Sequence, residues 1–214
     1  MELLCPAGNK KSLIAAINSG ADAIYLSGKK FGARAFATNF SNEELKEAIR
    51  IGKIYGVKIY VTMNTLIKEN EIDEFLSQVE FLYSNGVDAI LMQDFGMICL
   101  CLKKYPNLEI HASTQAHNSS LQGIDFLYKL GVKRVVLPRE MSLDEIKLIK
   151  TPIEKEVFIH GALCVSYSGR CLISQVLGGR SGNRGECTGC CRLPYKLIKN
   201  GKELKTEVTL EESK

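Results

Sequence analysis

The sequence has no tryptophan, only three histidines and, over 214 residues, a formal net charge of only +4. No apolar run approaches the roughly 18 residues that a membrane span needs. The opening MELLCPAGNKK lacks the basic start and the apolar stretch of a signal peptide. These absences predict a cytoplasmic protein with no membrane partner. The mild net charge says little about nucleic acid for the chain as a whole.

The chain does contain short apolar, β-rich runs that alternate with amphipathic stretches. This alternation is typical of parallel strands covered by crossover helices. We therefore predict an α/β protein with a TIM-like (β/α) barrel of about seven units, one short of closure, since a complete barrel takes about 250 residues. An open doubly wound sheet is the alternative. The predicted strands are Glu2–Cys5, Ala23–Leu26, Lys58–Met63, Ala89–Met92, Glu109–Ala112, Arg134–Leu137 and Val157–His160.

Helical periodicity is clearest in Asn42–Tyr55 and Ile72–Ser84. Ser41 followed by Glu44 predicts a capping box at the start of the first of these helices, because each side chain can bond to the other's backbone N–H. Ser142 and Glu145 have the same spacing. Glycines that can end a helix in the left-handed conformation precede several predicted strands, at Gly20, Gly86 and Gly131. The recurrence indicates a repeated strand–helix unit.

Three regions follow from this pattern. Residues 1–161 form the barrel portion, and residues 162–195 form a cysteine-rich segment continuous with it. Residues 196–214 are polar and charged and contain no convincing strand. We expect this tail to be the start of a truncated region, so that the chain is a fragment or a shortened relative of a longer protein.

Five of the eight cysteines fall in the cysteine-rich segment, separated by glycines that let the backbone wrap around a small object: Cys164, Cys171, Cys187, Cys190 and Cys191. In a reducing compartment such a cluster indicates metal binding or catalysis rather than disulfides. Thiolates suit an iron–sulfur cluster, and zinc remains the alternative because Cys187-x-x-Cys190 has the spacing of a zinc ribbon. No His-Glu-x-x-His sequence is present. A hydrolytic zinc site is therefore disfavoured.

Polar side chains follow several predicted strands and would converge on the C-terminal mouth of a barrel, where such folds place their chemistry. They include Asn64, Ser113, Gln115, Arg139, Glu140 and His160. The fork of an arginine can hold a carboxylate in two hydrogen bonds, so Arg139 is a candidate clamp for a small carboxylate. Arg170, Arg180, Arg184 and Arg192 predict a positive rim suited to an anionic substrate or an RNA backbone. An ordinary solvated loop remains the alternative.

Several motifs together resemble the U32 peptidase family. They are Glu2-Leu-Leu-Cys-Pro-Ala-Gly8, Gly20-Ala-Asp-Ala-Ile-Tyr25, His111-Ala-Ser-Thr-Gln115, Val136-Leu-Pro-Arg-Glu140, the run from Glu156 to Cys164, Cys171-Leu-Ile-Ser174, Arg184-Gly-Glu-Cys187 and Cys191-Arg-Leu-Pro-Tyr195. The resemblance implies one of two activities. The family is named for collagenase-like peptidases, whereas other members are oxygen-independent hydroxylation proteins that act on tRNA, ribosomal RNA or ubiquinone precursors.

The hydroxylation proteins carry an iron–sulfur cluster, expected here as 4Fe-4S, and are linked to prephenate as a hydroxyl source. Carried over to this sequence, the ligands are Cys164, Cys171 and Cys187, with Cys191, Cys190 or a residue beyond Lys214 as the fourth. We assign catalytic roles to Arg139, Glu140, His160 and Glu156, and substrate-binding roles to Asn64, His111, Ser113, Gln115 and Arg184.

Three functions stay open. The first is cluster-dependent RNA hydroxylation. The second is a peptidase acting on peptide substrates through His160 or Cys164. The third is a non-catalytic, metal-stabilised subunit of a homo- or hetero-oligomer, which the missing eighth unit favours.

Overall fold

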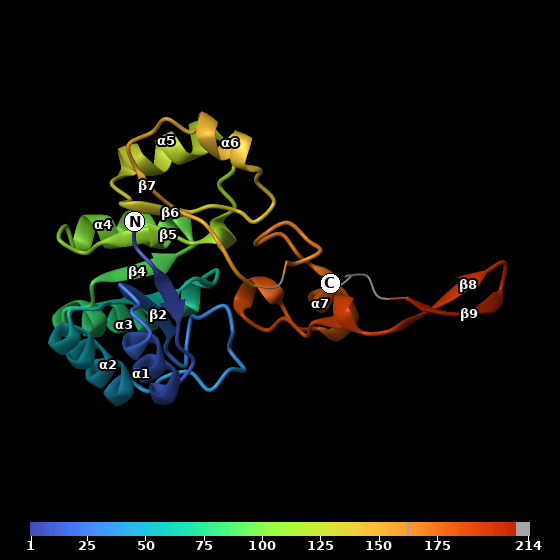
Figure 1. The fold of residues 1–214 in the computed structure, drawn as a ribbon, viewed down its shortest axis with the longest axis horizontal. Helices are drawn as coiled ribbons and strands as arrows, with labels where there is room; N and C mark the ends of the chain where they lie inside the picture. The colour runs from blue at the N-terminus through green and yellow to red at the C-terminus, as the bar shows by residue number, and fades with distance from the viewer. Residues whose placement is uncertain (162, 209–214) are drawn as a thin grey trace.

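Seven parallel strands follow one another in chain order, and each pairs with the next to form a curled half-barrel (Figure 1). The computed structural model describes residues 1–161 and 163–208. The strands are β1 (Leu4–Pro6), β2 (Ala23–Ser27), β3 (Lys58–Met63), β4 (Ala89–Met92), β5 (Ile110–Ala112), β6 (Arg134–Val136) and β7 (Glu154–Glu156). Sequential parallel order confirms the barrel prediction over the doubly wound alternative, in which the strand order reverses.

Helices cover the outer face of the sheet. They are α1 (Lys10–Asn18), α2 (Asn42–Tyr55), α3 (Ile72–Ser84), α4 (Phe95–Lys104), α5 (Leu121–Leu130) and α6 (Leu143–Leu148), with α7 (Ile173–Gly178) in the cysteine-rich segment and short 3-10 turns at η1 (Glu69–Glu71), η2 (Thr114–Ala116), η3 (Gly182–Arg184) and η4 (Cys190–Arg192). The main core lies between helices and sheet, where Leu45, Phe75 and Leu82 are fully buried. Among the described residues, no helix has the length and apolar character to cross a bilayer.

The two best-defined predicted helices are confirmed at their predicted bounds as α2 and α3. Both capping boxes are present, the first with Ser41 and Glu44 and the second with Ser142 and Glu145. The three strand-preceding glycines all have positive φ: Gly20, Gly86 and Gly131.

The barrel is open between β1 and β7, which do not pair with each other. No eighth strand–helix unit joins these two edges within the described part of the chain. Within the described residues the fold is therefore an incomplete barrel.

The predicted seventh strand, Val157–His160, is wrong. The strand is Glu154–Glu156, three residues earlier, and Val157, Phe158 and Ile159 are exposed. An apolar run indicates a strand only where both faces of the sheet are buried. Here β7 lies at the edge of the sheet, and its two glutamates contact Arg134. Its sequence is therefore the charged Glu-Lys-Glu and not an apolar run.

The tail that was predicted to lack strands also differs. Strands β8 (Tyr195–Lys199) and β9 (Lys202–Val208) form an antiparallel hairpin. Asn200 and Gly201 both have positive φ, as the tight hairpin turn of an Asn-Gly pair requires. The polar composition concealed this turn signal. Residues 209–214 of that tail lie outside the described residues.

Candidate functional site

The cysteine-rich segment lies across the C-terminal mouth of the half-barrel (Figure 1). Asn183 contacts the loops after β3 and β4, since its carbonyl accepts from Gln93 Nε2 at 3.0 Å and from the Leu66 N–H at 3.4 Å. Next to it, the Gly185 carbonyl accepts from the Ala35 N–H at 2.9 Å. The segment is therefore held at the mouth by its own backbone.

Two glycines permit this close approach. Gly169 has φ +70°, and a Cβ there would lie 1.9 Å from the Gln115 carbonyl oxygen. Gly185 has φ +82°, and its Cβ would lie 2.3 Å from the Gly32 carbonyl oxygen. No side chain fits at either distance, because backbone atoms cannot move aside. Two of the glycines that lie between the cysteines thus serve to seat the segment on the barrel.

Ser168 joins the segment to the loop after β6. It is 1% exposed, its N–H donates to Glu140 Oε1 at 2.6 Å, and Arg139 Nη2 donates to its Oγ at 3.2 Å. The Arg139 guanidinium also lies 5.7 Å from the centre of the Phe158 ring. Two residues predicted as catalytic, Arg139 and Glu140, therefore meet each other through one buried serine at the mouth.

A second pair of predicted residues meets after β3 and β5. Asn64 Nδ2 donates to Ser113 Oγ at 3.0 Å, and Asn64 Oδ1 accepts from the Ala33 N–H at 2.9 Å. Ser113 Oγ also accepts from the Gln115 N–H at 3.2 Å. Asn64, Ser113 and Gln115 thus form one hydrogen-bonded group at the floor of the mouth.

The predicted positive rim is partly paired. Arg184 forms an ion pair with Glu71 on η1, and it also donates to the Leu66 carbonyl at 2.5 Å. The guanidinium of Arg180 lies 4.1 Å from the centre of the Phe36 ring. These two arginines fix the segment to the barrel rather than extend from it, whereas Arg170 is exposed.

The thiols of Cys187 and Cys190 lie on either side of Ser174, whose Oγ is 3.7 Å from one sulfur and 3.8 Å from the other. The Gly189 N–H donates to Cys187 Sγ at 3.4 Å. Hydrogen bonds from Thr188 and Ser174 lower the pKa of Cys190. Such bonds favour the thiolate, which is the form that binds metal.

The remaining predicted ligands are less concentrated. Cys164 is exposed, Cys171 is half-buried and Cys191 is buried. Over residues 1–161 and 163–208, no group of three or more His, Cys, Asp or Glu side chains is arranged to hold a metal ion. The donor chemistry fits a thiolate-bound cluster, with Cys187 and Cys190 as the pair already close together. His160 is exposed, four residues before Cys164.

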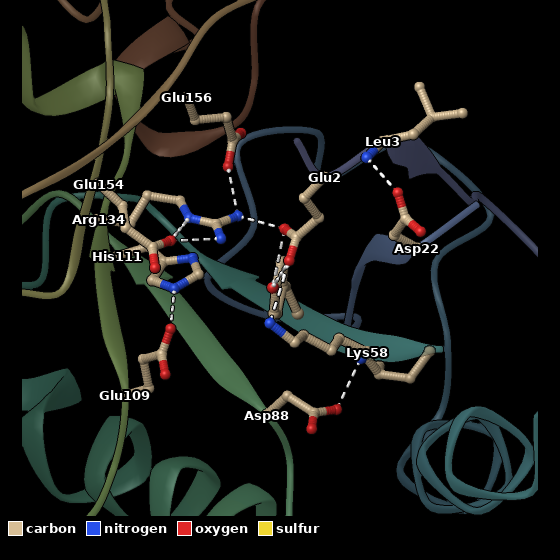
Figure 2. A network of polar contacts seen from close by, with 12 residues as sticks. Glu2, Leu3, Asp22, Lys58, Asp88, Glu109, His111, Arg134, Glu154 and Glu156 are labelled. Carbon is tan, nitrogen blue, oxygen red and sulfur yellow. Dashed lines mark hydrogen bonds and ion pairs between the residues drawn. The ribbon is translucent and has the colours of Figure 1, made fainter. Parts of the chain in front are cut away.

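A dense ionic network occupies the interior at the opposite, N-terminal end of the barrel (Figure 2). Its centre is Arg134, whose side chain is 8% exposed. Arg134 contacts Glu2 at 2.6 Å, Glu154 at 2.7 Å and Glu156 at 3.4 Å. Because Glu2 precedes β1 while Glu154 and Glu156 lie on β7, this one guanidinium bridges the open seam.

Two predicted site residues belong to this network rather than to the mouth. His111 is fully buried, its Nε2 lies 2.8 Å from Glu109 Oε1, and its ring packs edge-on against Tyr60. Burial lowers the pKa of His111. Burial raises the pKa of Glu156 against the opposing effect of Arg134. Burial also raises the pKa of Glu2, but hydrogen bonds from Arg134 and Lys58 outweigh it and bring that pKa to about 2.

Sequence reasoning missed Arg134 and Ser168. The sequence did hold a signal for Arg134, because a charged residue at the start of an otherwise apolar strand needs oppositely charged partners if it is buried. Glu154 and Glu156 are two such carboxylates, and their spacing places both on the same face of a strand. Ser168 gave no comparable signal. A serine among glycines and cysteines is ordinary in a loop, and its burial depends on the docking of the whole segment.

The similarity to known proteins covers most of the chain. The model of the family described as Peptidase family U32 matches residues 8–213. The chain is 44% identical over 199 residues to the 23S rRNA 5-hydroxycytidine C2501 synthase of Escherichia coli (strain K12), covering 92% of this chain and 30% of that protein. It is 40% identical over 198 residues to tRNA hydroxylation protein P1 of Bacillus subtilis (strain 168), covering 92% and 47%.

Among solved structures, that of the U32 peptidase Mk0906 superimposes with a TM-score of 0.64 at 14% identity, covering 73% of this chain and 68% of that one. At this identity the likeness shows the fold. The chain spans from less than a third to about half of the length of the two curated relatives.

Proposed function

The chain belongs to peptidase family U32, and on this premise we propose that it takes part in oxygen-independent hydroxylation of tRNA or ribosomal RNA, using an iron–sulfur cluster in its cysteine-rich segment. The observation that carries the proposal is the identity of 40–44% with two RNA-hydroxylation proteins over 92% of this chain, which includes both the barrel and the cysteine-rich segment. An RNA substrate also agrees with the predicted cytoplasmic location.

The proposed cluster ligands are Cys164, Cys171, Cys187 and Cys191, with Cys190 as the alternative fourth thiol. A bound 4Fe-4S cluster would supply one-electron transfer without oxygen. The chain's own contribution would be to seat the segment through Gly169 and Gly185 and to tune Cys187 through N–H and O–H donors, since hydrogen bonds to the sulfurs set the potential of such clusters. Zinc in the same thiols remains the alternative.

The proposed hydroxyl source is a small carboxylate such as prephenate, bound at the mouth by Arg139. Its Nη2 already holds a neutral acceptor, Ser168 Oγ, beside the Phe158 ring. A carboxylate in this position would form the stronger, charge-assisted bond. Asn64, Ser113 and Gln115 offer further hydrogen-bonding groups at the floor of the same mouth.

Anaerobic purification with iron, sulfide and zinc analysis tests the cluster. We expect iron with matching sulfide and a visible absorption band, both lost in Cys164→Ala. Cys99→Ala is the matched control, because Cys99 is an exposed cysteine on α4, outside the cysteine-rich segment. Zinc alone would indicate a structural site, and a metal-free protein would contradict the proposal. Mass spectrometry of tRNA and ribosomal RNA from cells with and without the gene tests the reaction.

The family's own name favours a second candidate, a peptidase. It would use the exposed His160 or Cys164, four residues apart at the edge of the mouth. Purified protein would then cleave gelatin or short peptides, and His160→Ala would abolish the cleavage. Cleavage that persists in both His160→Ala and Cys164→Ala would point to a contaminating protease.

Exposed apolar residues after β7 favour a third candidate, a subunit that needs a partner chain. They are Val157, Phe158, Ile159, Leu163, Val165, Tyr167, Leu172, Val176 and Leu177. So many exposed apolar side chains in one short segment indicate an interaction surface. Light scattering would show a stable oligomer, and activity that appears only after the partner is added would support this candidate.

A further inference from the structure

The β8–β9 hairpin extends away from the barrel beyond the cysteine-rich segment (Figure 1). Tyr195 anchors its base, because the Tyr195 hydroxyl donates to the Cys190 carbonyl at 2.8 Å. A two-stranded hairpin that packs on nothing else is marginally stable in water. The described side chains of its outer part, residues 196–204, are all exposed. The arm is thus placed for contact with another molecule.

The outer part of the hairpin carries more positive than negative charge. Residues 196–204 contain three lysines and one glutamate. The glutamate, Glu203, is already paired with Lys196 at 2.9 Å. Within the described part of the chain, Lys199 and Lys202 form no ion pair. These two lysines stand directly opposite each other in the register of the hairpin, so both point to the same face.

Like charges directly opposite each other destabilise a strand pair. Here they flank the turn of a hairpin whose described outer side chains are all exposed. A polyanion that bridges the two ammonium groups would remove this repulsion and stabilise the arm at once. Glu203 points to the other face, since it follows Lys202 along the strand, and therefore does not repel an anion on the lysine face.

We propose that the β8–β9 hairpin is an RNA-binding arm whose Lys199 and Lys202 contact successive backbone phosphates. The inference rests on the proposed RNA-hydroxylation function, which supplies the polyanion. An RNA held by this arm would lie beside the cysteine-rich segment, because the hairpin continues from η4 through Leu193 and Pro194. The arm reads charge and spacing rather than sequence, as phosphate contacts do.

The test is binding of the 214-residue chain to a tRNA transcript and to a 23S rRNA fragment, measured by fluorescence anisotropy over a series of KCl concentrations. Lys199→Gln/Lys202→Gln removes both charges and also their repulsion, so the hairpin remains able to fold. Each phosphate contact contributes about 0.7–0.9 to the slope of log K against log salt. The double variant is therefore expected to make the slope shallower by about 1.4–1.8. If both proteins bind equally at ~1 M salt, this difference weakens binding by about 25- to 60-fold at ~0.1 M salt.

Lys10→Gln/Lys11→Gln is the matched control. It removes the same charge from two exposed lysines at the start of α1, which lies within the barrel portion and away from the hairpin. The control is expected to change the slope by much less than the hairpin variant. Equal effects of the two variants, no effect of the hairpin variant, or no RNA binding by the chain would each overturn the inference.

Hydroxylation of the same RNAs, measured by mass spectrometry, separates the two proposals. Arm-dependent binding without any hydroxylation would keep the arm and remove the proposed reaction. Hydroxylation that proceeds with unchanged RNA affinity in the Lys199→Gln/Lys202→Gln variant would keep the reaction and remove the arm.

Discussion

The two ends of the half-barrel are built in opposite ways. At the N-terminal end, one buried arginine meets three carboxylates and each charge has a partner (Figure 2). At the C-terminal mouth, the cysteine-rich segment is held by backbone contacts at glycines, while Cys164, Cys187 and His160 are exposed. At the N-terminal end the charged groups bind each other, whereas at the mouth these two cysteines and this histidine face solvent.

The contrast between the two ends agrees with the usual division of labour in (β/α) barrels. In (β/α) barrels the N-terminal face contributes to stability and the C-terminal face carries the reacting groups. His111 and Glu156 appear as site residues in the sequence motifs, yet both lie in the ionic network. Substitutions at the two ends should therefore separate loss of folding from loss of function.

The largest effect is expected for Arg134→Ala. Its removal leaves Glu156 in the barrel interior without its positive partner and leaves Glu2 with Lys58 alone, and breaking a buried pair in this way costs about 3–5 kcal/mol. Urea unfolding followed by circular dichroism measures the loss. Lys129→Ala, which breaks an exposed pair with Asp125, should cost less than about 1 kcal/mol. Similar losses for both variants would show that the network stabilises no more than a surface ion pair.

Gly169→Ala should come next, with an effect at the mouth. The left-handed conformation costs a non-glycine residue about 1–2 kcal/mol, and overpacking against the Gln115 carbonyl adds about 1–3 kcal/mol. We expect the segment to detach locally, seen as faster proteolysis within residues 157–195 while the barrel remains folded.

Gly179→Ala provides the control for that experiment. Gly179 has φ +65° but nothing within 4 Å of an added Cβ, so only the conformational cost applies. Equal proteolysis rates in the two alanine variants would mean that close contact at Gly169 does not hold the segment.

Ser168→Ala should have a smaller effect at the same place. It removes the hydroxyl that links Arg139 to Glu140 but keeps the backbone bond to Glu140, for a loss of about 1–2 kcal/mol. Ser166→Ala, two residues earlier and only half-buried, should change the unfolding free energy by less than about 0.5 kcal/mol. Thermal unfolding of both variants decides whether the serine link matters.

The last comparison concerns the network's titration, which changes the stability of the protein little near neutral pH and most in acid. The pKa of Glu2 is lowered to about 2 in the folded protein, so its contribution to stability is complete above the ordinary glutamate pKa and is lost as the pH falls toward 2. Glu156 acts in the opposite sense, because its raised pKa makes its ionisation unfavourable to folding as the pH rises.

Denaturant unfolding across this acid range measures both contributions. Glu2→Gln should flatten the loss of stability between pH 4.5 and about pH 2. Glu156→Gln should instead act above pH 4.5, where it removes the loss of stability that accompanies the ionisation of Glu156. An unchanged pH profile in Glu2→Gln would show that the carboxylate does not carry the acid sensitivity.

The elements that could be predicted from sequence are those whose signals are local. Periodicity and the capping box at Ser41 placed α2 correctly, and the glycine before β2 is left-handed as expected. An apolar pattern could not locate β7, because its glutamates pair with Arg134. Glu154 lies 20 residues after Arg134 along the chain, so no local pattern shows the pairing. The hairpin was missed although Asn200-Gly201 is a strong turn signal, since its strands lack an apolar face.

The candidate site likewise has a part that local sequence signals predict and a part that depends on distant contacts. Their positions just after predicted strands indicated Arg139, Glu140, Asn64 and Ser113, and the structure brings them together in two hydrogen-bonded groups. Which residues pair across the mouth depends on how residues 163–195 dock, and that docking follows from Gly169 and Gly185 meeting carbonyl groups of other loops. No local pattern encodes such a meeting.

The contact between Glu2 and Arg134 joins residues 132 positions apart. Every strand of the sheet pairs with the one made just before it, so the sheet can assemble step by step as the chain leaves the ribosome. The Glu2 carboxylate can bind Lys58 and Tyr60 once β3 has been made, but its contact with Arg134 must wait until β6 has been synthesised. The ionic bridge across the seam would therefore form only after the strands have paired in order, and it would then tie the first strand of the sheet to the last.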